Sequence, residues 1–522
     1  MLAPFLAALF LAAPAPTPVV ALVPLAAPAD LQELAYAVSL RLQEGLERTP
    51  LFVMHQKQIY VVADATRVSE DKFATLADVK RIGERLGATH LLFGELRHND
   101  KVIELVLSLT IGGAAPSRKL LTVPSGEAPT IVDGAPGLLV EVIGGVLDSA
   151  AINLVKATPA FSARAYKDYA ACHKALTRQA VSLRTPVLLD ADSRVAAVQK
   201  CTQATKAAPQ MKQAFAALAF ARALVGEREE AEAALASAKG EGLIPYYAVA
   251  KFWVLSRFYD PQSAVAFLKE ATQQAPGFLL GRGYLGEALN ATKRYDEALE
   301  VFTAYAQDVP KQPWARAQIG YTQAKRGEVA KAIDETKSAL DLTPDDQELK
   351  LELASRFIDA QRYLEAQRML DAQARDPNVR GEVLLRLSYA HLMQDHLAEA
   401  EKWSKLALER ATSAREWRTR GRARYDLARI AAKKGNKAAA LDELERAFAE
   451  GYKDAAKLAN EKDFDTIRTE PRFTALGSKP KPAQIKLPLF TSPFAHDPLT
   501  GGEAPLASKD SPLQKKAVEV RF

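Results

Sequence analysis

The sequence predicts an α/β N-terminal domain, then an all-α superhelical solenoid of paired helices, and last a disordered C-terminal tail. Three observations indicate this order. Short apolar runs alternate with helical patterns up to about residue 155. Alanines then recur at a nearly constant interval over a long part of the chain, which is typical of a solenoid. The final stretch, residues 477–522, is rich in Pro, Gly, Ser and Lys and has no periodicity.

Composition places the chain among soluble globular proteins with two or more domains. It has 522 residues, of which 48% are hydrophobic and 25% charged. The net charge of +6 is spread thinly, with no long run of like charge, whereas a nucleic-acid-binding surface concentrates Lys and Arg. We therefore expect no nucleic-acid partner.

Residues 1–17 begin with an apolar run that has the length of a signal-peptide core and is too short to span a membrane. Small residues at Ala13 and Ala15 suit a cleavage site, although Pro16 follows them and no basic residue precedes Arg41. We expect a signal peptide and a periplasmic or secreted protein; the alternative is a cytoplasmic protein with an uncleaved N-terminus. The remaining chain holds no segment that would cross a bilayer.

The next segment, residues 18–155, mixes strand and helix patterns. A β-branched apolar run predicts a strand ending at Pro24, and Gly87 is expected to end a helix as its C-cap. The strands are expected at 18–24, 51–53, 90–96, 102–111 and 118–123, and the helices at 30–48, 76–86 and 131–155.

Three parts of this segment resemble the N-terminal domain of TolB and related FlgO-like domains of bacteria. They are the helix DLQELAYAVSLRLQEGLERTPLFVM after Pro24, the segment VKRIGERLGATHLLFGEL at 79–96, and the hairpin KVIELVLSLTIGG at 101–113. The stretch LAAPAD after Pro24 departs from the family, which has polar residues there. The resemblance implies a compact α/β domain that takes part in envelope complexes.

The repeat register rests on small residues at a fixed interval. Pro276, Pro310 and Pro344 are evenly spaced, and Gly286, Gly320 and Ala354 follow one another at the same interval. A small residue is expected where the two helices of a pair come closest, and the proline ends the second helix. The alanines of the second helix form the longest series, Ala197, Ala231, Ala264, Ala298, Ala332, Ala366, Ala400 and Ala440.

The segments at 294–310 and 328–344 resemble the second helix of a tetratricopeptide repeat. We predict about eight helix pairs between 161 and 455, with an insertion at 181–192 and six extra residues near 409–420. The third pair lacks the small residue of its first helix. Residues 456–476 end in Glu-Pro-Arg-Phe and are expected to cap the last pair, whose apolar face would otherwise be exposed.

Two cysteines, Cys172 and Cys201, fall in the two helices of the first predicted pair. A disulfide between them is conceivable, but two small buried thiols are the favoured interpretation. No metal-binding or redox spacing of cysteines occurs.

No motif points to catalysis, a cofactor or a metal. GRGYLG at 281–286 matches a dinucleotide-binding pattern, but it lies inside a predicted helix rather than after a strand. His391 and His396 are five residues apart, which is not a zinc-binding helical spacing, and His55, His90 and His98 are scattered. We therefore predict that the chain is not an enzyme.

The predicted binding surface is the groove formed by the first helices of successive pairs. By resemblance to the family, the residues that face it are Phe220, Glu287, Asn290, Trp314, Tyr321, Lys325, Ser355, Asp359 and Tyr389. Aromatic rings beside a few polar groups suit a peptide ligand. The competing interpretation is that several of these side chains support packing. The Lys, Arg and Asn set of the chaperone-type carboxylate clamp is not present.

These observations favour a non-enzymatic scaffold or adaptor of the bacterial envelope that binds a partner polypeptide in the groove. One alternative is a cytoplasmic regulatory or sensory adaptor with the same architecture. The other is a small-molecule-binding α/β domain to which the repeats are accessory. Converging ionisable residues in a pocket of residues 18–155 would favour the latter.

Overall fold

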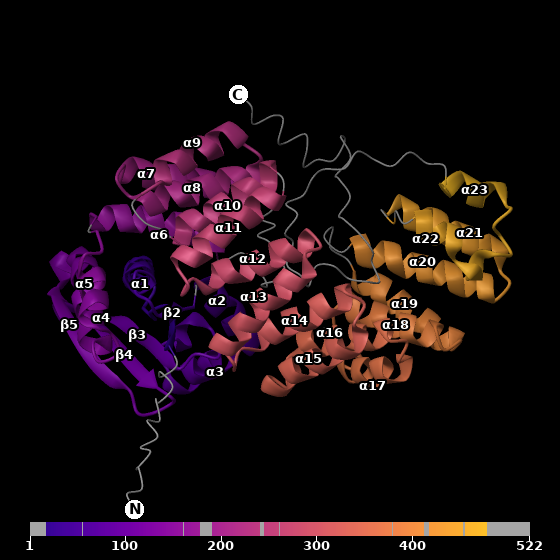
Figure 1. Ribbon diagram of the computed structural model, residues 1–522, viewed down its shortest axis with the longest axis horizontal. Helices are drawn as coiled ribbons and strands as arrows, with labels where there is room; N and C mark the ends of the chain where they lie inside the picture. The colour runs from indigo at the N-terminus through magenta and orange to yellow at the C-terminus, as the bar shows by residue number, and fades with distance from the viewer. Residues whose placement is uncertain are drawn as a thin grey trace, which may run out of the picture.

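The computed structural model describes residues 17–477 except 55, 160, 178–190, 241–244, 260, 378, 412–416, 451 and 453–454. A sheet domain lies at one end of the molecule, and a curved row of paired helices extends from it (Figure 1). Four sequence expectations fall outside the described residues, namely the signal peptide, most of the insertion at 181–192, the tail and His55.

A five-stranded mixed sheet forms the centre of the N-terminal domain. Its order is β2-β1-β3-β4-β5, with β1 parallel to β2 and β3 and the other neighbours antiparallel. Strand β4 lies between β3 and β5, and most of its residues are buried, on both faces of the sheet. The strands are β1 (Val19–Leu22), β2 (Phe52–Val53), β3 (His90–Asn99), β4 (Val102–Ile111) and β5 (Ser117–Pro124).

Five helices accompany the sheet, and they differ from the sequence expectation in two places. The expected helix at 131–155 is broken into α4 and α5, because Gly144 ends α4 and the Asp148 carboxylate caps α5 by accepting from the Ala151 N–H at 2.7 Å. Helix α2 was not predicted. The helices are α1 (Gln32–Glu47), α2 (Gln56–Thr66), α3 (Leu76–Leu86), α4 (Ile131–Ile143) and α5 (Ser149–Lys156).

Gly87 ends α3 with a φ of 68°, in the left-handed region, as its position predicted. Its Cα also approaches the repeats closely, because a Cβ added there would lie 2.7 Å from the backbone nitrogen of Gln312. This glycine therefore serves both the turn and the contact between the two parts of the chain.

The described part of the chain after α5 contains eight successive helix pairs. The first helices are α6 (Ala163–Thr177), α8 (Lys212–Val225), α10 (Pro245–Phe258), α12 (Leu279–Ala291), α14 (Pro313–Lys325), α16 (Gln347–Asp359), α18 (Gly381–Leu392) and α20 (Trp417–Lys433). The second helices are α7 (Ala191–Ala207), α9 (Arg228–Ala238), α11 (Pro261–Gln274), α13 (Tyr295–Asp308), α15 (Val329–Leu342), α17 (Tyr363–Ala374), α19 (Leu397–Arg410) and α21 (Lys437–Ala449).

Small residues set the distance between the helices of a pair. All eight alanines of the repeat series lie on second helices and are fully buried. A Cβ on Gly286 would meet the Phe302 ring at 2.3 Å, and one on Gly320 would meet Thr336 Oγ1 at 2.7 Å. In the third pair, Phe252 takes the place of the small residue, is buried, and stacks on Tyr284 at 4.5 Å between ring centroids.

The cap after the last pair consists of α22 (Ala455–Asn460), a short 3₁₀ turn at Lys462–Phe464, and α23 (Pro471–Gly477). Phe464 and Phe473 pack in one apolar cluster with Tyr425 of α20 and Leu444 of α21. The cap thereby covers the stacking face that a following repeat would otherwise occupy.

The sheet domain packs against the turns that lead from one helix pair to the next. The ring of Phe52 lies 5.9 Å from the guanidinium of Arg282, and Arg85 forms ion pairs with Asp345 and Asp346 at 3.4 and 3.3 Å. One apolar cluster accordingly runs from Val19 of β1 to Ile319 of α14. The domain and the first repeats share a core.

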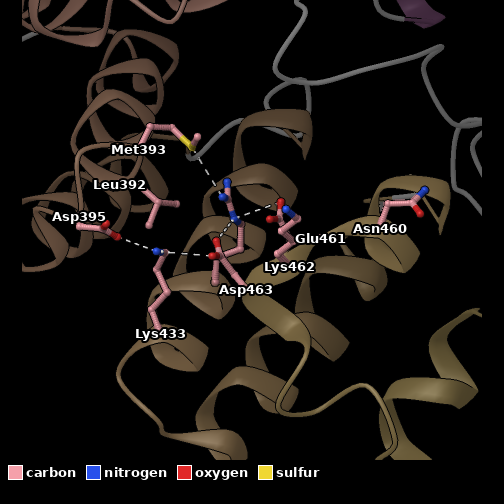
Figure 2. Close-up of a pocket in the computed structure, with 9 residues that line it drawn as sticks. Leu392, Met393, Asp395, Lys433, Asn460, Glu461, Lys462 and Asp463 are labelled. Carbon is pink, nitrogen blue, oxygen red and sulfur yellow. Dashed lines mark hydrogen bonds and ion pairs between the residues drawn. The ribbon is translucent and has the colours of Figure 1, made fainter.

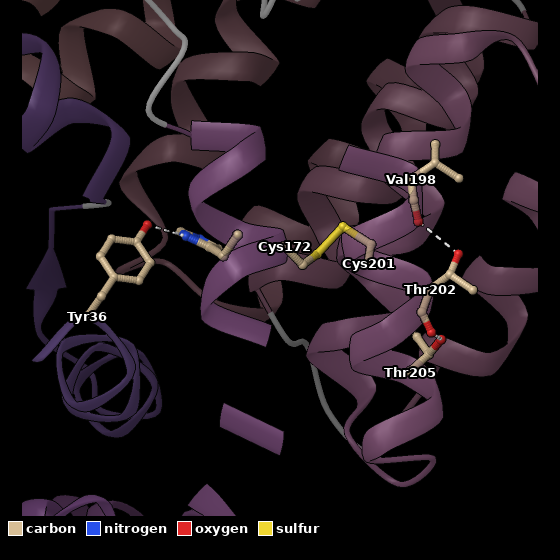
Figure 3. The surroundings of a disulfide bond; sticks show 7 residues. Tyr36, Cys172, Val198, Cys201, Thr202 and Thr205 are labelled. Carbon is tan, nitrogen blue, oxygen red and sulfur yellow. Dashed lines mark hydrogen bonds between the residues drawn. A yellow bond between two sulfur atoms is a disulfide. The ribbon is translucent and has the colours of Figure 1, made fainter. Parts of the chain in front are cut away.

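A polar junction joins α1 to the first pair. The Tyr36 hydroxyl lies 2.8 Å from His173 Nδ1, and Arg41 donates to the carbonyl oxygens of Thr158 and Pro159 at 2.8 and 2.5 Å. Beside His173, Cys172 forms a disulfide with Cys201 that joins α6 to α7 (Figure 3).

The expectation of two free thiols was therefore wrong. Cys172 and Cys201 are both fully buried, and their Cα atoms lie 4.6 Å apart, within the range that a disulfide spans. The packing of α6 on α7 brings the two cysteines together, and the sequence pattern placed them on these helices without showing that they face each other.

The same junction buries a carboxyl group. Both oxygens of Glu44 on α1 are buried without a hydrogen-bond partner among the described residues. Burial raises the pKa of Glu44 to about 8, which the nearby positive charge of Arg41 offsets only in part. The buried tyrosines Tyr166 and Tyr169 of α6 also face this carboxyl.

Within the described residues, no helix is both long enough and apolar enough to cross a membrane.

Candidate functional site

The nine residues predicted to face the groove all lie on first helices, from α8 to α18. We call the surface to which they belong the inner face. Lys325 is exposed, Tyr321 and Ser355 are buried, and the other six are half-buried. The inner face therefore offers fewer accessible side chains than the sequence pattern alone indicates.

Many of these side chains join one first helix to the next. The amide of Asn290 donates to Thr322 Oγ1 at 2.9 Å, which connects α12 to α14. The guanidinium of Arg386 donates to Ser355 Oγ at 2.7 Å, which connects α18 to α16. The rings of Phe220 and Trp253 lie 5.3 Å apart between centroids, and this contact connects α8 to α10. These contacts fix the stacking of successive pairs.

Trp314 is held between neighbouring repeats. Its ring lies 5.7 Å from that of Phe302 and 5.4 Å from that of Tyr305, and a Cβ added to Gly283 would approach it to 2.9 Å. Truncating Trp314 would therefore leave a cavity in the helix stack, and loss of binding in such a variant would not by itself identify a ligand contact.

Four charged groups meet at the middle of the inner face. Arg356 is buried against Glu352, and it also donates to Asp359 at 2.8 Å. Its guanidinium lies 5.9 Å from the Tyr321 ring. The pKa of Lys325 is lowered by partial burial and then by the charge of Arg356. Lys325 is thus an exposed cation beside a neutralised cluster.

The inner face continues onto α20, beyond the residues that were predicted. Arg429 follows Tyr389 by the same interval that separates Ala400 from Ala440, so the repeat register itself identifies it. Its guanidinium lies 5.8 Å from the Tyr389 ring, and that of Arg422 lies 5.4 Å from the same ring. Extending the register through the six extra residues would have found Arg429.

A pocket of about 330 Å³ opens at this end of the inner face (Figure 2). Three parts of the chain form it: the turn after α18, the end of α20, and the end of α22 with the 3₁₀ turn of the cap. Its lining residues are Leu392, Met393, Asp395, Arg429, Lys433, Asn460, Glu461, Lys462 and Asp463.

Ion pairs hold the pocket walls together. Arg429 Nε lies 2.7 Å from Asp463 and 3.2 Å from Glu461, while Lys433 Nζ lies 2.6 Å from Asp395 (Figure 2). Met393 is 37% exposed and Lys462 is exposed, with no ion pair to Lys462 among the described residues. The pocket therefore presents a flexible apolar side chain next to a cation.

The dinucleotide-like stretch GRGYLG lies within α12, where its glycines contact Phe278, Trp314 and Phe302. A larger side chain at any of these three positions would collide with one of these rings. Helix packing therefore accounts for the glycines, and phosphate binding is not needed to account for them. Among the described residues, no three His, Cys, Asp or Glu side chains are grouped as metal ligands.

Comparison with known proteins supports the repeat assignment. Residues 258–319 match the tetratricopeptide repeat family model; the match runs from the end of α10 into α14 and does not include the sheet domain. No curated protein matches the chain.

Parts of this chain are similar to several solved structures. One is pilF of Pseudomonas aeruginosa, at 18% identity over 38% of this chain and 90% of that one, with a TM-score of 0.32. A tetratricopeptide repeat protein of Parabacteroides merdae gives 18% identity over 44% and 90%, with a TM-score of 0.37. One of Thermus thermophilus gives 23% over 34% and 94%, with a TM-score of 0.29.

Proposed function

This chain carries tetratricopeptide repeats, and we propose that it is a non-enzymatic scaffold of the bacterial cell envelope that holds a partner polypeptide on the inner face. Tetratricopeptide repeats imply protein–protein interaction. The inner face, the envelope location and the TolB-like identity of the sheet domain are the specific parts of the proposal.

The main support for the proposal is that the sheet domain covers only part of the row of repeats. The sheet domain packs against the turns that precede α12, α14 and α16. The pocket between α18, α20 and the cap lies beyond that contact and keeps Met393 and Lys462 exposed. A partner would therefore bind toward the C-terminal end of the inner face.

The pocket favours a peptide that combines an apolar side chain with a carboxylate. The thioether of Met393 adapts its shape to apolar groups, and this property suits it to recognition surfaces. Lys462 supplies the cation that the ion pairs of the pocket do not neutralise. Aromatic and aliphatic anchors in such pockets usually supply most of the binding free energy.

Two features support export. Disulfides persist in oxidising compartments, and Cys172 pairs with Cys201. The apolar run at 1–13 has the length of a signal-peptide core. Sequencing the mature protein tests this point: a new N-terminus near residue 16 is expected, whereas an intact Met1 would favour the cytoplasmic adaptor.

Variants of the pocket test the proposed surface. In Met393→Glu combined with Lys462→Glu, capture of envelope proteins by the purified chain should fall at least tenfold, because two exposed lining groups then oppose an apolar or acidic ligand. Affinity capture from cells that express the protein, quantified by mass spectrometry, measures the loss.

The matched control is Leu364→Glu, which places a new carboxylate on the second helix α17, at a leucine that is 48% exposed. Capture should not change in this variant. If the pocket variant and the control capture the same proteins at the same level, the pocket is not the binding surface.

A further inference from the structure

The strand β5 forms an open edge of the sheet, at the end away from the repeats. It pairs only with β4 in the order β2-β1-β3-β4-β5, whereas β2 at the other edge lies near Arg282 of α12. Figure 1 shows β5 on the outer side of the sheet domain. An open edge strand presents unpaired N–H and C=O groups to any strand that approaches it.

The register shows which backbone groups of β5 point outward. Gly112 N–H donates to the Thr89 carbonyl, and Ser125 N–H donates to the Lys101 carbonyl, at 3.0 and 2.8 Å. Antiparallel ladders alternate, so the odd-numbered residues of β4 face β5 and pair with Lys119, Leu121 and Val123. The backbone groups of the intervening residues, Arg118, Leu120 and Thr122, therefore point away from the sheet.

The side chains of the same three residues lie on the sheet face opposite α4. Leu121 points the other way and packs against α4, where its Cδ2 would lie 2.6 Å from a Cβ on Gly134. On the open face, Leu120 is 52% exposed. A pocket of about 300 Å³ adjoins it, lined by Phe93, Val106, Ser108 and others.

The charge of this edge is not balanced. Arg97 of β3 pairs with Glu95 and Glu104, at 2.9 Å in both cases. Arg118 and Lys119 are exposed, and the described residues supply no carboxylate within ion-pair distance of either. The open edge therefore carries two cations that no carboxylate of the described residues pairs with. Arg118 lies on the face of Leu120 and the pocket, whose lining also includes the paired Glu95 and Arg97, and Lys119 lies on the opposite face.

We propose that β5 is a docking edge for an extended, acidic segment of a partner polypeptide. The segment adds as a sixth strand through the outward N–H and C=O groups of Arg118, Leu120 and Thr122. Side chains of the added strand alternate between the two faces, so its apolar side chains enter the pocket over Leu120 on the face of Arg118, and its carboxylates lie beside Lys119 on the opposite face. The proposal goes beyond the proposed function, because it gives the sheet domain a contact of its own with a partner.

Charged residues on an edge strand can also protect a protein against aggregation. Docking and protection predict different behaviour toward an added strand. Protective cations keep other strands from pairing with the edge, so in that role no added strand protects the outward amides of β5. A docking edge binds acidic strands selectively and protects its own outward amides when it does so. The two roles are therefore distinguished by comparing the binding of an acidic and a basic strand.

The test uses the full chain and two labelled probe peptides, acetyl-(Glu-Val)₄-amide and acetyl-(Lys-Val)₄-amide. Fluorescence anisotropy should show binding of the acidic peptide alone, weakening at least tenfold when the salt concentration rises from about 0.05 to about 0.3 M, because screening acts on exposed charges. Hydrogen exchange measured by mass spectrometry should slow over residues 117–124 when the acidic peptide is present.

Two variants separate the backbone from the charge. Thr122→Pro removes one outward N–H and leaves the hydrogen bonds to β4 intact, so affinity for the acidic peptide should fall at least tenfold. Arg118→Glu combined with Lys119→Glu should reverse the preference toward the basic peptide. Lys156→Glu on α5 combined with Lys437→Glu on α21 is the matched control for net charge, since it also reverses two exposed cations, and it should bind as the parent chain does.

Unchanged unfolding midpoints establish that each variant is folded. Acidic-peptide affinity that is the same in the parent chain, in Thr122→Pro and in the charge variant would overturn the proposal. Slowed exchange over the repeats instead of β5 would overturn it as well and would leave the inner-face proposal standing. A dimer that Thr122→Pro dissociates would assign the edge to a second copy of the chain.

Discussion

At the scale of single residues, the turn between the two helices of a pair depends on one residue in the left-handed conformation. This residue is Gly226, Gly327 or Gly435 in three pairs and Lys293, Gln361 or Asp395 in three others. In the turn after α16, the Arg362 N–H reaches back to the Phe357 carbonyl at 2.8 Å, as in a Schellman-type helix end. The same turn therefore recurs with glycine in some repeats and with a larger residue in others.

A prediction follows for Gln361, which has a φ of 58° and is exposed. Gln361→Gly should raise the free energy of unfolding by about 0.5–1 kcal/mol. Removing the Cβ relieves about 1–2 kcal/mol of left-handed strain, and the greater freedom of glycine in the unfolded chain returns about 0.5–1 kcal/mol of it. Chemical denaturation followed by circular dichroism measures the change.

Gln361→Ala is the matched control, since it shortens the side chain and keeps the Cβ. It should leave the free energy of unfolding unchanged within about 0.5 kcal/mol. An equal gain from alanine and glycine would mean that the side chain, and not the backbone conformation, is responsible.

At the scale of elements, the cap is joined to the last repeat by charge as well as by apolar packing. Helix α20 carries Arg422, Arg424, Arg429 and Lys433, which pair with carboxylates of the same helix and of neighbouring elements. Arg429 is 5% exposed, and its partners Glu461 and Asp463 lie in the cap, directly after α22. This ion pair also forms a wall of the inner-face pocket.

Arg429→Met should therefore loosen the cap. Removing Arg429 leaves Glu461 without a cation and Asp463 with Lys433 alone, at 3.5 Å, and the loss of one partner of a largely buried ion pair costs about 3 kcal/mol. Hydrogen exchange over residues 455–477 should accelerate strongly, while exchange in α12–α15 stays the same.

Arg472→Met provides the comparison, because Arg472 pairs with Asp442 and Glu445 on the exposed side of the same cap. Exposed ion pairs contribute little to stability, so its exchange pattern should match that of the parent chain. Equal acceleration in both variants would show that the buried position of Arg429 does not matter.

The elements of the sheet domain show what the sequence pattern can and cannot resolve. The strand β4 was predicted with its observed bounds, because ten residues of strand-forming character lie between two turns. The long helix at 131–155 was predicted as one element because both α4 and α5 are apolar, and the pattern gave no weight to Gly144 and Gly145. Helix α2 was not predicted, because the run Ile-Tyr-Val-Val at its centre consists of residues typical of strands.

At the scale of the whole molecule, the sheet domain and the first repeats are joined through the buried junction around Glu44. The pKa of Glu44, at about 8 in the folded chain, lies above its unfolded value. The folded state therefore holds a proton that the unfolded state releases at lower pH. Stability from this group is complete below about pH 4.5 and decreases as the pH rises to about 8.

The prediction is that acidification from pH 8 to pH 6 stabilises the junction. Two groups of α1 contribute, since burial also raises the pKa of Glu47 to about 7, and each proton adds roughly 1.4 kcal/mol per pH unit at most. In Glu44→Gln this dependence should become shallower, and the part that remains belongs to Glu47. Hydrogen exchange of α1 and α6, measured at several pH values and corrected for the intrinsic rate, reports the stability of the junction.

Glu33→Gln on the same helix is the control, because Glu33 is exposed and pairs with Lys167. It should retain the slope of the parent chain. If Glu44→Gln and the parent chain show the same slope, the buried carboxyl is not the group that titrates.

The sequence by itself determined the fold class and the repeat register. Periodicity is a local property, so Ala264, Ala298 and Ala332 reveal the helix pairs without knowledge of their neighbours. The same register named first-helix positions such as Tyr321 and Ser355, but it could not tell an accessible position from one that contacts the next helix. Burial depends on how successive pairs stack, which no single repeat encodes.

Only the tertiary structure decided which groups meet across long stretches of chain. It paired Cys172 with Cys201, brought Glu44 beneath α6, and placed the cap residue Asp463 against Arg429. It also left β5 as the open edge of the sheet. Each of these contacts joins residues of different elements, so its physical basis is the packing of those elements rather than local preference.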